Sequence, residues 1–147
     1  VLAADGFGKG RPAADSPFNL VLADKDGLTH IANRPRAVQE RWPGGIYGLS
    51  NAETGAPWPR KDRLNHALTE WFGAEGHDPV DLFDVLLDEQ CPVSGDPPIF
   101  IRNDIYGTRC STLVAVDGDG GGCIMERRFD RDGNFARESR FAFDWPS

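Results

Sequence analysis

Two short polar runs carry the residues of this sequence that could do chemistry. They span positions 47–51 and 106–112, and each places a tyrosine and a glycine ahead of a polar group: the Asn51 amide in one and the Arg109 guanidinium in the other. Glycine lets a ligand or another backbone approach closely. A buried amide or guanidinium is unfavourable unless something binds it. We therefore expect the two runs to form the wall of a binding site.

Each candidate side chain also has a structural interpretation. The Asn51 amide could donate to an oxyanion or close a turn after a strand. Arg109 could grip both oxygens of a carboxylate or pair with a surface acid. Trp58, which lies between two prolines, could face a ligand beside Tyr106 or pack against a sheet. The ligand-binding set that we predict is Asn51, Trp58, Tyr106 and Arg109.

The sequence does not predict a metal site. His30, His66 and His77 are scattered over an expected strand, helix and loop without metal-ligand spacing. His66 lies off the apolar stripe of its helix, so a solvated histidine is expected there. The acidic segments at 117–119 and 130–134 lack the pattern of a calcium loop and indicate hairpin turns.

Cysteine usage indicates a reducing compartment. The 3 cysteines form no CxxC pair, which argues against a zinc site and against a disulfide framework. If Cys110 and Cys123 share a hairpin turning near Gly120, Cys123 faces about Val116, too far from Cys110 to bond. We therefore expect a cytoplasmic protein.

Composition limits the fold and the partners. With 147 residues, 39% of them hydrophobic, and with 17 glycines and 11 prolines, the chain suits one turn-rich α+β domain. Its net charge of −7 argues against nucleic acid or an anionic membrane as the main partner. No apolar run is long enough to span a bilayer.

The elements that must position these residues follow from turn signals and periodicity. We expect a loose lead-in over 1–17, then a series of strands at 18–23, 28–32, 38–42 and 45–49. The spacing of Leu64, Leu68, Trp71 and Phe72 predicts a helix that ends at Gly73. A second helix should begin at Asp78.

The last third of the chain alternates in the manner of a β-meander. Strands are expected at 99–101, 109–116, 123–129 and 135–143. The whole pattern predicts an α+β fold in which two helices cover one face of an antiparallel sheet.

Several sequence blocks carry a family resemblance. In chain order they lie at 16–22, 47–51, 57–61, 82–88, 99–101, 106–112 and 126–129. Together they resemble the C-terminal part of the transport and Golgi organization protein 2 family, also called the NRDE family. The similarity runs from about Ser16 to Phe129.

The resemblance implies a fold and a missing part. The family is similar to N-terminal-nucleophile hydrolases, so it implies part of an αββα sandwich, with 18–147 as the C-terminal part of the family's domain. Family members begin with Met-Cys and carry an Asn-Arg-Asp-Glu signature; this chain begins with Val1 and contains no such string. We expect the C-terminal portion of a longer protein, which is not catalytic alone because it lacks the nucleophile.

The resemblance also implies a function. The family is implicated in intracellular haem trafficking and in Golgi and secretory organisation, which suggests binding of haem or another amphipathic carboxylate. Arg109 would hold the acid, and Trp58 or Tyr106 would stack on the apolar part. The alternative is an amide (C–N) hydrolase with Asn51 as oxyanion donor, as in the bile-salt hydrolase and penicillin acylase group.

A missing half of the sandwich would leave apolar surface exposed. The sheet face carrying Leu113, Ile124 or the row of Phe135, Phe141 and Phe143 would then need another cover. We expect a dimer, or a second chain that bears the missing strands.

Overall fold

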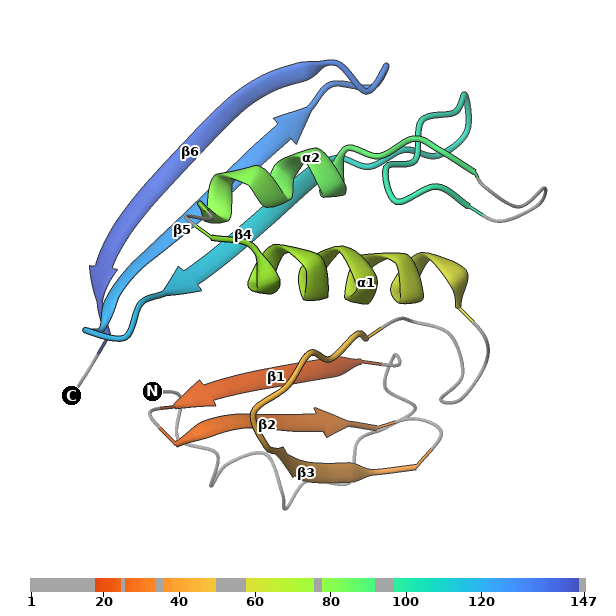
Figure 1. The fold of residues 1–147 in the computed structure, drawn as a ribbon. Helices are drawn as coiled ribbons and strands as arrows, with labels where there is room; N and C mark the ends of the chain where they lie inside the picture. Colours follow the sequence, from red (N-terminus) through yellow and green to blue (C-terminus); the bar gives the residue numbers. More distant parts are fainter. Residues whose placement is uncertain are drawn as a thin grey trace. The chain divides into compact units, whose positions relative to one another are not determined.

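The chain divides into two compact units. The computed structural model describes residues 18–24, 26–33, 36–49, 58–75, 78–91 and 97–145 (Figure 1). The N-terminal unit comprises Val1–Gly44 with Asn51–Thr54, and the C-terminal unit comprises Gly45–Ser50 with Gly55–Ser147. The predicted lead-in at 1–17, Asn51 and His77 lie outside the described residues. The boundaries predicted for the family's domain remain a prediction.

The N-terminal unit holds a three-stranded antiparallel sheet. Its strands β1 (Asn19–Asp24), β2 (Gly27–Ala32) and β3 (Val38–Trp42) pair in chain order. The predicted hairpin is confirmed, and its turn uses Gly27 at φ 135°, a backbone angle that favours glycine. Arg41 donates two hydrogen bonds to Asp24. These bonds are the main reason that the pKa of Asp24 falls to about 2.

One face of this sheet is organised around His30, which is only 8% exposed. The imidazole stacks on Trp42 with the ring centroids 4.9 Å apart. Its Nε2 lies 3.0 Å from Oδ1 of Asn19, and its Nδ1 lies 3.3 Å from Oε1 of Glu40. Both ring nitrogens therefore have partners within the sheet, which indicates a structural role for this histidine.

The C-terminal unit begins with the helices. Helix α1 runs over Pro59–Gly73, with Pro59 in its first turn, and an extended Ala74 follows it. A 3₁₀ turn, η2 (Pro79–Asp81), leads into α2 (Leu82–Leu86). The predicted cap is confirmed: Asp78 accepts from Val80 N, and Asp81 accepts from Asp78 N. This reciprocal capping box stabilises the start of the turn.

A three-stranded antiparallel meander completes the C-terminal unit. Its strands are β4 (Cys110–Val116), β5 (Gly121–Phe129) and β6 (Phe135–Asp144), with β5 in the centre. Asp117 closes the β4–β5 turn by accepting from the backbone N–H groups of Asp119 and Gly121. The prediction of these strands is confirmed. Cys123 faces Ala115, one residue from the predicted position.

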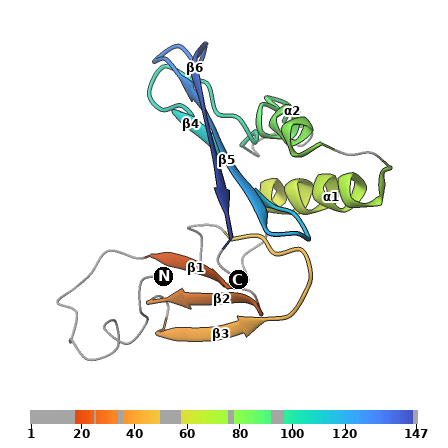
Figure 2. The same ribbon diagram turned by 90° about the vertical axis from the view of Figure 1, so that its left-hand side faces the viewer.

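Both helices lie on the same side of this sheet (Figure 2). The core between them contains Phe83 of α2, Phe100, Met125 and Phe129. The Arg127 guanidinium lies 4.1 Å from the centroid of the Phe83 ring and pairs with Glu138 of β6. An apolar core with a stacked arginine therefore joins α2 to the sheet.

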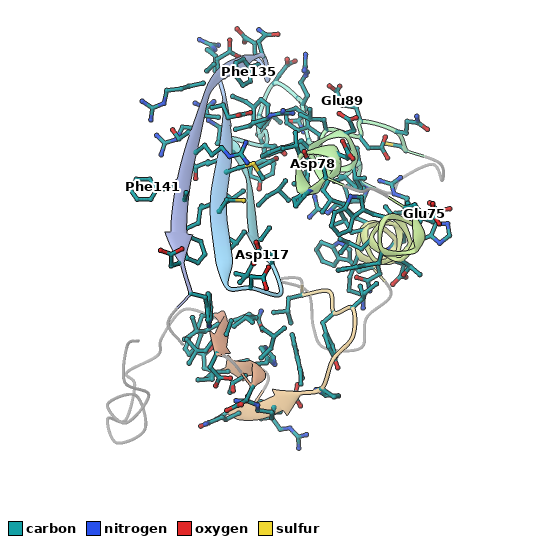
Figure 3. All side chains as sticks on the ribbon, turned by 60° about the vertical axis from the view of Figure 1, so that its left-hand side comes forward. Glu75, Asp78, Glu89, Asp117, Phe135 and Phe141 are labelled. Carbon is teal, nitrogen blue, oxygen red and sulfur yellow. The ribbon has the colours of Figure 1, made fainter. Side chains whose placement is uncertain are left out.

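The other face of the sheet, which we call the open face, carries exposed apolar side chains. Val114 is 62% exposed and Phe141 is 74% exposed. Figure 3 shows Phe141 pointing away from the helices. The register places Val114 beside Ile124 and Ile124 beside Phe141. Leu113 faces Met125 on the helix-covered side, so the prediction that grouped it with an uncovered face was wrong for Leu113.

Two predicted strands are absent from the described residues. Residues 45–49 form no strand, because this backbone packs against α1: a Cβ at Gly48 would collide with the Lys61 side chain. Residues 99–101 also form no strand. There Phe100 N donates to the carbonyl of Asp88, two residues after α2, and the Ile101 backbone forms hydrogen bonds with Thr108. These local contacts take the bonds that a strand would use.

Candidate functional site

A cavity of about 1010 Å³ lies between α1 and the helix-covered face of the C-terminal sheet. Its apolar walls come from α1, from the η2–α2 turn and from all three strands. They include Leu68, Trp71, Phe72, Pro79, Leu82, Leu113, Ala115, Cys123 and Ala142. The volume is at the upper end of the range of small-molecule pockets.

The sequence builds this cavity from two apolar surfaces that do not fully meet. Alternation along β4 turns Leu113 and Ala115 toward the helices. The stripe on α1 presents Leu68 and Trp71, yet no residue of α1 is fully buried. Apolar side chains that line an empty space lose packing contacts, which a bound molecule could restore. This space is therefore the best candidate for a ligand site within the described residues.

The charges of the cavity are few and mixed. They belong to Asp117, Arg140 and Asp144. Asp117 is occupied by its own turn, as described above. Arg140 forms no ion pair with another described residue. The cavity can therefore hold an apolar body, and its polar groups do not by themselves select the charge of the ligand.

Trp58 lies at the start of α1, at the opposite end of the helix from Trp71. It is the N-cap residue, although its side chain makes no capping bond. Its half-buried ring lies 5.4 Å from the Arg60 guanidinium. The Trp58 ring therefore has a cation–π partner within its own helix turn. Trp58 does not line the cavity.

Tyr106 and Arg109 lie on the loop that enters β4. The Asn103 side chain accepts from Ile105 N and Tyr106 N, which fixes the loop and leaves Tyr106 66% exposed. Arg109 is exposed, and its carbonyl accepts from Phe129 N. The structure brings these two predicted residues into one segment, but neither lines the cavity.

The charge environment of Arg109 includes Asp130. The pKa of Asp130 is lowered, chiefly by a hydrogen bond from the Asn134 backbone and to a smaller extent by the Arg109 charge. Arg109 therefore lies near this carboxylate, but it forms no ion pair with a described residue.

Sequence reasoning missed the cavity. The spacing of Leu68, Trp71 and Phe72 predicted a helix with one apolar stripe and nothing about a cavity beside it. The pattern of a stripe shows which side of a helix is apolar but does not show how closely the opposite surface approaches. The small residues Ala115, Cys123 and Ala142 on the facing strands were the available signal.

The fold and the cavity define a mixed α+β protein with two antiparallel sheets and a ligand-sized apolar space. The family model described as Transport and Golgi organisation 2 matches residues 11–131. The chain therefore belongs to this trafficking-related family, as the resemblance indicated. No curated protein matches the chain. Within the described residues, no helix is long and apolar enough to cross a membrane.

Proposed function

We propose that this protein binds an amphipathic carboxylate, of which haem is one example, for intracellular transport. The observation that carries the proposal is the cavity of about 1010 Å³ between α1 and the sheet. An apolar space of this size matches a small amphipathic molecule, and burial of apolar ligand surface is the main favourable term on binding. Membership of the Transport and Golgi organisation 2 family supports the trafficking role.

Arg109 remains the proposed contact for the carboxylate. Leu113 in the cavity wall lies four positions further along the chain, which corresponds to about 13 Å along an extended chain. A ligand that contacts both would therefore be elongated and would run along β4. A shorter ligand would leave its carboxylate in solvent, without a contribution from Arg109.

The proposal includes a fuller sandwich around the C-terminal sheet. The resemblance implies a second sheet layer, and the exposed Val114, Val116, Ile124 and Phe141 side chains of the open face support the need for one. We propose that a second chain supplies this cover, since exposed apolar patches commonly mark interaction sites.

Filling the cavity tests the ligand proposal directly. The variant Ala115→Trp adds a large ring on the cavity side of β4. Ile124→Trp adds the same ring on the open face of the neighbouring strand β5, at a residue that does not line the cavity, and serves as the matched control. Haem is titrated into the full chain and into both variants, followed by its absorbance and by quenching of tryptophan fluorescence.

The proposal predicts that Ala115→Trp weakens haem binding at least about tenfold, while Ile124→Trp binds as the wild type does. Circular dichroism checks that both variants are folded. Equal binding by all three proteins would place haem outside the cavity, and no binding by the wild type would exclude haem as the ligand. Titration with a long-chain fatty acid then tests the wider class of amphipathic carboxylates.

A further inference from the structure

Strands β4 and β6 are the two edges of the C-terminal sheet, and β6 is the longer and more exposed of the two. In the described part of the chain it pairs with β5 alone. The strand is ten residues long and nine of these residues are exposed. An edge strand presents a row of unpaired backbone N–H and C=O groups, which can pair with another strand.

The residues of β6 on the two sides of Ser139 complement one another in charge next to it and match in type further out. Reading outward from Ser139, the strand carries Glu138 and Arg140, then Arg137 and Phe141, and then Ala136 and Ala142. When such a strand meets its own copy antiparallel, with the two-fold axis at Ser139, Glu138 of each copy lies opposite Arg140 of the other. The symmetry makes this ion pair twice, and opposite charges across strands are stabilising.

Neighbouring registers are disfavoured by charge. Side chains directly opposite one another must point to the same face, so the axis must pass through a residue. An axis at Glu138 or at Arg140 sets that residue against itself, with like charges opposed. An axis at Phe141 sets Glu138 against Asp144. An axis at Ala142 sets Arg140 against Asp144 and also makes that ion pair twice, but it pairs only residues 140–144 of β6, whereas the axis at Ser139 pairs residues 135–143.

The charged groups needed for the pairing are in place in the single chain. Glu138 accepts from Arg127 Nε at 2.9 Å, and its side chain remains 40% exposed. Arg140 shares the face of Glu138 by alternation and forms no ion pair with another described residue. Arg127 thus holds Glu138 at the edge, where its carboxylate can accept a second guanidinium.

We propose that two copies of this chain associate through β6, antiparallel and centred on Ser139, so that their two three-stranded sheets form one continuous sheet. The two-fold symmetry gives an isologous contact, the usual arrangement of homodimers. Arg140 and Ala142 also line the cavity, but neither the pairing nor its test requires a bound ligand.

Disulfide trapping tests the register. The variant Ser139→Cys places a thiol on the axis, where directly opposed Cα atoms are about 4.5–5.5 Å apart, within reach of a disulfide. Thr112→Cys, at an exposed position of the other edge strand β4, is the matched control, and Ala142→Cys reports the competing register. Because Cys91 and Cys110 are also exposed, peptide mass mapping must identify the bond formed under mild oxidation.

The expected result is a bond between the two copies of position 139, formed faster than any bond at 112 or 142. Trapping at 142 in preference to 139 would overturn the proposed register. Trapping at 139 that is no faster than at 112 would overturn the pairing itself.

A charge variant supplies a second test that needs no cysteine. Arg140→Glu opposes like charges at both symmetric positions and should raise the dimer dissociation constant by about tenfold or more, measured by analytical ultracentrifugation. Arg137→Glu makes the same change of charge on the open face, where the proposed register sets Arg137 opposite Phe141 of the other copy. This variant should change the dissociation constant less. An unchanged dissociation constant for Arg140→Glu, or a folded wild type that stays monomeric at high concentration, would contradict the proposal.

Discussion

At the scale of single residues, Arg109 shows how one side chain can satisfy two interpretations. It precedes β4, its backbone bonds to Phe129, and its charge acts on Asp130. A guanidinium so placed can be a local counter-charge or a docking point for an external carboxylate. Geometry alone does not separate these roles, because both use the same exposed donors.

Replacing this arginine separates them. If Arg109 contacts the ligand, Arg109→Ala should weaken binding of haem or a fatty acid by about 1.5–3 kcal/mol, the range for a hydrogen bond to a charged group. Isothermal titration calorimetry gives the affinity. Arg131→Ala removes an arginine that is 88% exposed, in the β5–β6 turn, and should leave the affinity unchanged. Equal affinities for wild type and Arg109→Ala would remove Arg109 from the site.

At the scale of elements, the sequence was most informative where turns are chemically marked. The β1–β2 and β4–β5 hairpins are specified by aspartate and glycine at their turns, and Asp78 with Asp81 marks the start of η2. These features are local, since a few adjacent residues determine the backbone. They were accordingly predicted close to their observed positions.

The two strand predictions that were wrong, at 45–49 and 99–101, concern segments whose backbone contacts residues distant in sequence. Residues 45–49 have the composition of a strand, yet Gly48 packs on α1 rather than in a ladder. Phe100 is similar, because its N–H is taken by Asp88 at the end of α2. Alternation predicts an extended backbone but does not identify the partner of that backbone. The cavity was missed for the same reason.

The contact between Gly48 and α1 gives a prediction for this element. Gly48→Ala places a Cβ against the Lys61 side chain and within 3.0 Å of Asn65 Oδ1. Overpacking of this kind should destabilise the C-terminal unit by about 1–3 kcal/mol, measured by urea unfolding followed by circular dichroism. Gly44→Ala, where nothing lies within 4 Å of the new Cβ, is the control and should be nearly neutral. No loss of stability in Gly48→Ala would mean that α1 does not hold this segment.

At the scale of the whole molecule, the C-terminal sheet has two different unsatisfied surfaces. The edge of β6 offers backbone groups and alternating charges, which suit another strand. The open face offers Val114, Val116, Ile124 and Phe141, which suit a packed layer. Pairing through β6 extends the sheet but leaves the open face uncovered. A dimer of this kind therefore does not replace the second layer that the family resemblance implies.

This difference yields a last prediction, using the dye ANS, whose fluorescence rises at exposed apolar surface. The full chain should bind ANS even as a β6-paired dimer, because the open face remains exposed in it. Phe141→Thr removes the most exposed side chain of the four and should lower the dye signal; Thr keeps strand propensity. Ala115→Trp fills the cavity instead and shows how much dye binds there.

A monodisperse protein that binds no ANS would mean that the open face is already covered, and the need for a covering chain would disappear. A signal that Ala115→Trp abolishes and Phe141→Thr leaves intact would assign the dye to the cavity. Loss of signal in Phe141→Thr alone would identify the open face as the surface to which a covering chain must bind.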